Sequence, residues 1–518
     1  MNAKNKTKKT LWQQFKDSIR IFSYKYLKTE IHNYGYNYSL KNFLIQLLVT
    51  FGVILTFGIL CKLDIFPLIF LIVIGLGLTP YIILAQFRFL YEEKRFSNAI
   101  NYMLQMIYSF KKTPKIVNAL MDTREVVDDF GVILIDKALD CLNENKIQDN
   151  KDNVEDEMNE NIFQQALKPL EEEYGCDRLK ALHDYMIHVE EIGGEYRNGL
   201  NLLLSDIQEW AERTYCYQKD RKAMKLKSIL AILLSLIICV VIVNLLPEQF
   251  SITSYALYQI STTILLGIFL FLYAFIQSKI NGSWLKYTPL VKDEMIDYYK
   301  QCAHGDFIKS SYIKAIPLYI LCVIGFIYFL IQRKLFWSAI FIGLTCLMGY
   351  YPYLQIKSAK NIIKREIEKT FPDWIRNLSL NLQMQNVYVA IKETATDTPY
   401  VLRTELENLL KEIDNDPLTI NPYNNFLKDY EMTEITTHMS MIYSLNKYGR
   451  ADAERQINAL IQRNNKMIEK SEILKNKDEI GIASFALTVM PEILTVIKML
   501  VDMSLLLLTF LTMTQSYI

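Results

Sequence analysis

The chain has 518 residues, of which 51% are hydrophobic and 22% charged, and its 57 basic and 56 acidic side chains almost cancel. A chain without a strong net charge has no overall field that attracts nucleic acid, so we expect no nucleic-acid partner. The eight cysteines show no CxxC spacing, which argues against a disulfide framework and a zinc site.

The hydrophobic residues are concentrated in six charge-free stretches. A helix needs roughly 18 apolar residues to cross a hydrocarbon core of about 30 Å, and each stretch is long enough. The stretches are residues 42–61, 65–87, 228–247, 249–278, 315–332 and 335–356. They predict an all-α polytopic membrane protein.

The N-terminal arm, residues 1–41, is basic and precedes the first apolar stretch. Trp12, Phe15, Ile19 and Phe22 recur at helical spacing among its lysines. This pattern predicts an amphipathic helix that lies on the membrane or on a partner protein. The arm is too long and too charged for a signal peptide, and no small-residue cleavage motif follows the first apolar stretch.

The apolar stretches pair into three transmembrane hairpins, residues 42–88, 228–278 and 315–356. The linkers within the first two hairpins carry at most one basic residue, whereas the segments between hairpins are rich in lysine and arginine near the membrane. Basic residues are retained on the cytoplasmic side. We therefore expect the N-terminus, the polar segments and the connector, residues 279–314, to be cytoplasmic. Arg333 and Lys334, which join the third hairpin, are exceptions to this rule.

Two long polar segments, residues 89–227 and 357–479, predict two cytoplasmic antiparallel helix bundles. Apolar residues recur at helical spacing in both, and neither shows the alternation typical of strands. Pro114, Pro169, Pro399 and Pro417 are expected to separate short helices. Residues 143–160, with seven acidic side chains, predict a solvated loop in the first bundle.

The C-terminal membrane segment, residues 480–518, allows one long pass or two short ones. Glu492, Lys498 and Asp502 interrupt it, and a charge at the bilayer centre costs at least about 2.5 kcal/mol. Two short passes that turn near Pro491 and Glu492, or one pass with an interfacial helix, both accommodate these charges, and we favour two passes.

The two polar segments also resemble each other, which predicts an internal repeat. VNALMDT at 117–123 corresponds to YVAIKET at 388–394, Tyr174 aligns with Tyr430, and Gly193-Gly194 falls within a residue of Gly449. Phe96 and Phe371 open the two copies. An internal duplication is the simplest explanation.

The segment IGGEYRNGLNLLLSDIQEWAE, residues 192–212, carries a resemblance to a known family. Its Gly-Glu pair, the later Gly-Leu and the spaced leucines resemble the signature of the type II secretion F family, which includes the tight-adherence pilus proteins TadB and TadC and the archaellum platform protein. The matching residues are Gly194, Glu195, Gly199, Leu200 and Leu204, and the second segment retains only Gly449, Ile457 and Leu460. Here the second glycine comes one residue later than is usual.

The resemblance covers residues 40–515 as a tandem of two F-type units. It implies an inner-membrane platform for pilus or pseudopilus assembly, whose partners are a cytoplasmic hexameric secretion ATPase and pilin or pseudopilin subunits. It also implies that the platform is not an enzyme and binds no cofactor. The sequence does not indicate which appendage is built or whether the chain forms a homo-oligomer.

Motifs for catalysis are absent from the sequence. There is no GxxxxGK[ST], HExxH or G-x-S-x-G segment, so a partner would have to hydrolyse ATP. His183 and His188 lie five residues apart, off a shared helix face, and we interpret them as half-exposed helix residues rather than metal ligands.

Two groups of residues remain as candidates for a site. Gly193 and Gly194 favour a helix break or a tight helix crossing over a contact with the ATPase, and Glu195 favours a helix first-turn position over a partner contact. The basic cluster Arg221, Lys222, Lys225 and Lys227 is first a signal for topology and lipid headgroups, and also a possible contact with an acidic motor surface.

Two other classes of function are weaker candidates. A secondary transporter usually carries ionisable residues in its membrane helices, and the six apolar stretches have none. A membrane sensor or enzyme would need a phosphoacceptor, nucleotide or metal constellation, and none is recognisable.

Overall fold

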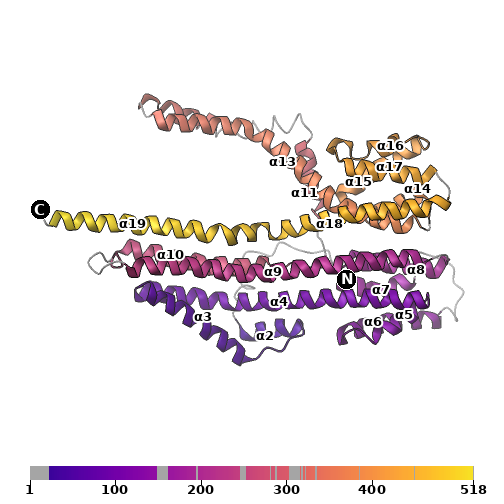
Figure 1. Cartoon of the computed structure of the whole chain (residues 1–518), viewed down its shortest axis with the longest axis horizontal. Coiled ribbons are helices and arrows are strands. Elements are labelled where there is room, and N and C mark those ends of the chain that lie inside the picture. The colour runs from indigo at the N-terminus through magenta and orange to yellow at the C-terminus, as the bar shows by residue number, and fades with distance from the viewer. Residues whose placement is uncertain are drawn as a thin grey trace. The chain divides into compact units, whose positions relative to one another are not determined.

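The computed structural model describes most of the chain. The described residues are 23–148, 162–193, 196–245, 252–280, 282–285, 289–302, 316, 319–320, 322–328, 330–332, 335–383, 385–447 and 450–516. Every regular element in these ranges is a helix, which confirms the all-α prediction (Figure 1). The chain divides into two compact units, unit 1 (Met1–Lys286 and Asn476–Ile518) and unit 2 (Tyr287–Lys475).

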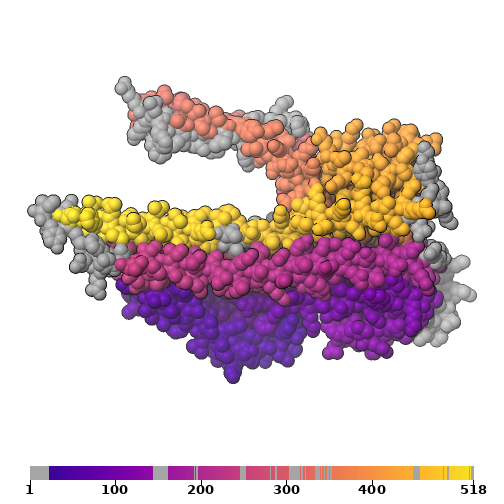
Figure 2. Space-filling model, viewed as in Figure 1, coloured from indigo at the N-terminus to yellow at the C-terminus, as the bar shows by residue number. Residues whose placement is uncertain are grey.

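Unit 1 combines long apolar helices with a bundle of shorter ones. Its helices are α2 (Tyr24–Asn33), α3 (Leu40–Leu60), α4 (Ile65–Lys112), α5 (Ile116–Arg124), α6 (Asp129–Gln148), α7 (Ile162–Tyr174), α8 (Asp177–Ile192), α9 (Arg197–Leu245), α10 (Ala256–Lys279) and α19 (Met490–Ser516). Helix α19 runs alongside α9 and α10, and α4 packs on both α9 and α10 (Figure 2).

Five helices among the described residues are long and apolar enough to cross a membrane. They are Leu40–Leu60, Ile65–Lys112, Arg197–Leu245, Ala256–Lys279 and Ser484–Thr512. Their side chains are mostly exposed to the surroundings, as expected for helices that face lipid. The chain is therefore a membrane protein in which the first four spans coincide with the first two predicted hairpins.

Helices α4 and α9 extend without a break from the apolar region into the polar bundle. Helix α4 has 48 residues and α9 has 49, so no helix ends at the expected boundaries near residues 88 and 227. Pro80 lies inside α4 without ending it. We call the polar bundle of unit 1, built from the polar halves of α4 and α9 with α5–α8, lobe 1. The helical backbones of α4 and α9 are thus continuous from the membrane region into lobe 1.

The favoured prediction of two short C-terminal passes is wrong. Helix α18 (Arg450–Thr488) ends two residues before α19 begins, and the span Ser484–Thr512 crosses this junction. The Val489 N–H donates to Phe485 O at 3.0 Å and the Ile493 N–H donates to Val489 O at 3.1 Å, so the helical hydrogen bonds continue. Pro491 is tolerated because it lies in the first turn of α19, where its missing N–H costs little.

Unit 2 contains a second helical bundle. Its helices are α11 (Lys292–Cys302), α13 (Leu335–Asn381), α14 (Val387–Thr396), α15 (Tyr400–Asn415), α16 (Asn421–Asn425), η2 (Lys428–Tyr430), α17 (Thr433–Lys447) and α18, which continues into unit 1. Its core surrounds Phe371 and Trp374, which are 0% and 2% exposed. We call the bundle formed by α14–α17 with the adjacent parts of α13 and α18 lobe 2.

The two lobes repeat one order of helices and one pattern of burial. In chain order, helices α4, α5, α6, α8 and α9 of lobe 1 correspond to α13, α14, α15, α17 and α18 of lobe 2. The buried residues are spaced identically in the paired helices. On α5 they are Ile116, Ala119, Leu120 and Thr123, and on α14 they are Val387, Ala390, Ile391 and Thr394. On α9 they are Leu200, Leu203, Ile207, Trp210, Ala211 and Thr214, and on α18 they are Ile457, Leu460, Asn464, Met467, Ile468 and Ser471.

Three other predictions meet the structure only in part. Pro169 does not separate helices but lies inside α7, whereas Pro114, Pro399 and Pro417 lie at helix ends as expected. The predicted third hairpin is only partly within the described residues and is not among the five spans. Residues 1–22 of the arm and 149–161 of the acidic segment lie outside the described residues, and 143–148 belong to α6.

Candidate functional site

Arg221, the first residue of the predicted basic cluster, is buried rather than exposed. It lies on α9 with 2% of its surface exposed. Its Nη2 donates to Glu479 Oε2 at 2.5 Å and to Asn476 Oδ1 at 2.9 Å, and its Nη1 donates to Ile280 O at 3.2 Å. The guanidinium carbon lies 4.2 Å from the centre of the Trp284 ring. We call these five residues the Arg221 clasp.

The clasp joins three separate segments of unit 1. Asn476 and Glu479 belong to the part of α18 that leads into α19, while Ile280 and Trp284 follow the end of α10. Gly282 leaves room for them, because a Cβ at this position would lie 2.6 Å from Arg221 Nη1. A buried guanidinium is tolerated only when it is paired with an opposite charge and hydrogen-bonded. Arg221 meets both conditions, through its ion pair with Glu479 and its hydrogen bonds to Asn476 and Ile280. The clasp therefore fixes α18 to α9 beside the apolar helices.

The remaining basic residues of the cluster differ in how far they are available. Lys222 Nζ donates to Glu93 at 2.5 Å, and Lys225 Nζ lies 3.6 Å from the centre of the Phe89 ring. Lys227 is exposed. The expectation of a four-residue contact surface is thus wrong for Arg221, whose side chain is used inside unit 1, and a partner or lipid headgroup can reach Lys222 and Lys227.

The residues on which the resemblance to the type II secretion F family rests are only partly described. Gly193 ends α8 with a φ of +74°, a conformation that glycine adopts easily, which agrees with the interpretation as a helix break. Gly199 and Leu200 are buried on α9 and Leu204 is half-buried, so they serve the core of lobe 1. Gly194, Glu195 and Gly449 lie outside the described residues.

His183 is fully buried, contrary to the expectation of a half-exposed residue. Its Nδ1 donates to Glu171 Oε1 at 2.8 Å, and its Nε2 lies 3.0 Å from the hydroxyl of Tyr102. His188, by contrast, is half-buried. No group of three His, Cys, Asp or Glu side chains among the described residues could hold a metal ion. His183 therefore acts as a hydrogen-bonded core residue that joins α4, α7 and α8.

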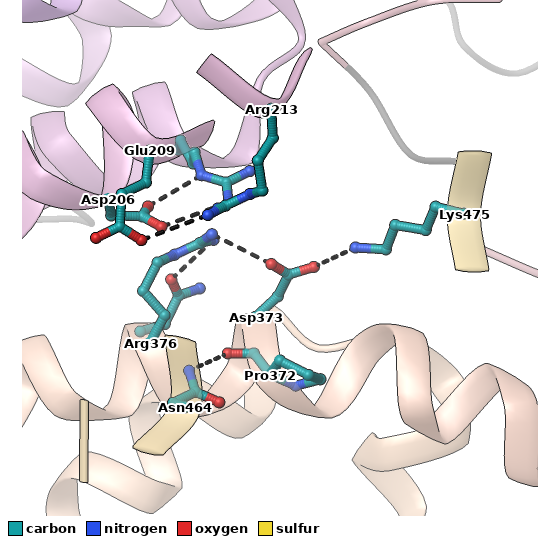
Figure 3. A network of polar contacts seen from close by, with 10 residues as sticks. Asp206, Glu209, Arg213, Pro372, Asp373, Arg376, Asn464 and Lys475 are labelled. Carbon is teal, nitrogen blue, oxygen red and sulfur yellow. Dashed lines mark hydrogen bonds and ion pairs between the residues drawn. The ribbon is translucent and has the colours of Figure 1, made fainter. Parts of the chain in front are cut away.

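Lobe 2 has its own polar network, which combines the buried Arg376 and Asn464 with the half-buried Asp373 and Lys475 and was not predicted from the sequence. Figure 3 shows Asp373 between Arg376 and Lys475, at 3.1 Å and 2.7 Å, and the Asn464 amide donating to Pro372 O at 2.8 Å. Asn464 occupies the position on α18 that Ile207 occupies on α9. A polar residue at this position, within a stripe of apolar residues at helical spacing, is the signal in the sequence that could have indicated the network.

His438 is a buried titratable group in lobe 2. Its Nδ1 donates to Glu434 O at 2.7 Å, and its ring lies edge-on to Phe371. Burial lowers the pKa of His438 below its usual value, and the nearby Arg463 acts in the same direction. The imidazole is therefore neutral in the folded protein near pH 7.

The C-terminal span contains an ion pair inside the apolar region. Lys498 and Asp502 are paired on one face of α19, and they are 4% and 3% exposed. Lys498 Nζ also lies 4.1 Å from the centre of the Tyr258 ring on α10. Paired in this way, the two charges are accommodated among apolar helices at a lower cost than either alone.

Comparison of the chain with family models, with curated proteins and with solved structures found no match.

Proposed function

We propose that the chain is a non-catalytic platform of a type IV pilus, tight-adherence or type II secretion-like machine in the cytoplasmic membrane. In this proposal both lobes are cytoplasmic and arose by duplication. They couple a hexameric secretion ATPase to pilin or pseudopilin subunits in the membrane. The observation that carries the proposal is the repeated helical lobe joined to membrane helices, since α4 and α9 are common to lobe 1 and to the spans.

The connections between the lobes and the membrane support a coupling role. Helix α18 begins in lobe 2 and ends beside the apolar helices, where the Arg221 clasp holds it to α9. Each lobe thus leads into membrane helices through helical backbone rather than through a loop. A displacement imposed on a lobe by a motor would reach the membrane through these helices.

The proposal assigns ATP hydrolysis to the partner, because the sequence has no phosphate-binding loop of the common type. It also gives a role to the polar contacts inside the lobes, such as those of His183 in lobe 1 and Asn464 in lobe 2. Such networks fix the packing of helices, which a coupling element requires.

The test is to purify the full-length protein in detergent and to measure its binding to the secretion ATPase from the same organism. We expect a stable complex and no ATP hydrolysis by the platform alone. The matched control is a multi-pass membrane protein of similar size in the same detergent. Absence of binding, together with normal pilus or pseudopilus assembly in a deletion strain, would refute the proposal.

A further inference from the structure

Lobe 1 exposes four large apolar side chains within one helical corner, the turn from α5 into α6. Met121, Val126, Phe130 and Ile133 are 51%, 56%, 49% and 52% exposed. Phe130 and Ile133 lie three residues apart and share one face of α6. The opposite faces of both helices pack into the core of lobe 1. The inner side of the corner is therefore held in the core of lobe 1, whereas its outer side exposes apolar side chains.

The corresponding corner of lobe 2 is polar. There the turn from α14 into α15 exposes Lys392, Thr396 and Asp397, and no large apolar side chain of α14 or α15 is among the exposed ones. The two lobes share a burial pattern on the inside but differ here on the outside. Exposed apolar residues gathered in one place mark a binding surface more often than a core defect, so this difference points to a partner specific to lobe 1.

Acidic residues surround the apolar side chains. Residues 121–136 contain five acidic side chains and one basic one. Arg124 is paired with Asp136 at 2.6 Å, and Asp128 accepts from Asn98 at 2.6 Å. Glu125 and Asp129 are exposed and have no partner among the described residues. We call residues 121–136 the acidic corner.

This charge selects among possible occupants. A second copy of the corner would place like charges opposite each other across a two-fold axis, and the acidic segment 149–161 would be repelled as well. A partner surface with apolar side chains at its centre and lysine or arginine at its rim is complementary to the corner both in hydrophobicity and in charge.

We propose that the acidic corner of lobe 1 is the docking face for the motor, and that the motor meets it with an apolar patch ringed by basic residues. This inference rests on the proposed function and adds the location and the chemistry of the contact. The apolar centre supplies affinity, whereas Glu125 and Asp129 steer association and make it dependent on salt.

The test measures binding of the full-length protein in detergent to the secretion ATPase by biolayer interferometry, at about 50 mM and about 300 mM NaCl. We expect the double variant Phe130→Asp/Ile133→Asp to bind at least about tenfold more weakly at both salt concentrations. We expect Glu125→Lys/Asp129→Lys to bind more weakly at low salt and to lose most of the salt dependence. The matched control, Lys392→Asp/Thr396→Asp in lobe 2, should bind within about twofold of the parent chain.

The outcomes separate the two proposals. Failure of the parent chain to bind the motor refutes the proposed function, whereas parent-like binding by both corner variants overturns the docking face and leaves the function standing. Because all four substituted side chains are exposed, the variants should keep the parent's elution volume and thermal midpoint, which confirms that they fold. A dimer that Phe130→Asp/Ile133→Asp dissolves, without loss of motor binding, would assign the corner to a second copy and overturn the proposal.

Discussion

Arg221 illustrates how a residue's role depends on its place along a helix rather than on its neighbours in sequence. It belongs to a basic run, which favours an exposed lipid or partner contact. Yet it continues the buried stripe of α9, in which Thr214 and Gln218 are also buried. Helical periodicity alone could have indicated its burial, whereas Asn476 and Glu479 lie too far along the chain to be identified as its partners from sequence.

Replacing Arg221 should destabilise unit 1 far more than replacing its neighbour Lys222. Arg221→Met leaves Asn476 Oδ1 and the buried Ile280 O without their donor, and an acceptor left unpaired in the interior costs about 1–3 kcal/mol. Lys222 is 54% exposed in its pair with Glu93, and such pairs contribute at most about 1 kcal/mol. The measurement is the midpoint of thermal aggregation in detergent at one heating rate, and equal midpoints for Arg221→Met and Lys222→Met would contradict the clasp.

At the scale of the element, the sequence predicted the positions of the first membrane helices better than the residues at which helices end. Residues 42–61 and 249–278 correspond closely to α3 and α10. The predicted changes from membrane segment to bundle near 88 and 227 fall inside α4 and α9, because a change from apolar to charged side chains alters the surroundings of a helix without interrupting its hydrogen bonds. No breaker stands at either boundary, so α4 and α9 continue.

The prediction of two C-terminal passes was wrong for a different reason, because the fold accommodates within one span both the proline and the charges that favoured a turn. Pro491 takes a first-turn position, and Lys498 neutralises Asp502 on the same helix face. An i, i+4 pair of opposite charge was visible in the sequence. Its burial against Tyr258 could not be predicted, since α10 lies more than 200 residues earlier.

The pair in α19 should behave as a coupled unit. Lys498→Met or Asp502→Leu alone leaves one buried charge unpaired, whereas the double variant replaces both charges with apolar side chains of similar size. We expect each single variant to lower the yield of monodisperse protein and its thermal midpoint more than the double variant does. If the double variant shows the sum of the single effects, the two charges do not stabilise each other.

At the scale of the whole chain, the weak sequence repeat reflects a much closer repeat of buried positions. VNALMDT and YVAIKET share few identities, but all four buried positions of α5 recur on α14. Burial tolerates exchange among apolar residues, so two segments can share a pattern of buried positions with few identical residues. The contact of Asn464 with Pro372 could not be derived from this repeat, because lobe 1 has Ile207 at the corresponding position.

The proposed topology predicts that both lobes face the same side of the membrane. We expect single cysteines at Glu125 in lobe 1 and Lys392 in lobe 2, introduced after replacement of the native cysteines, to react with a membrane-impermeant maleimide only after permeabilisation. A cysteine at Ser254, between α9 and α10, should react in intact cells and serves as the control. Labelling of only one lobe in intact cells would refute the arrangement.

The unbroken course of α4 gives unit 1 a mechanical advantage. At 1.5 Å per residue its 48 residues extend for about 72 Å. If α4 tilts by about 5° about its end in lobe 1, its opposite end moves sideways by about 6 Å, which is more than half of the roughly 8–10 Å between the axes of packed helices. Small angular changes among the polar helices would thus become sideways displacements of the membrane end of α4 that approach the spacing between packed helices.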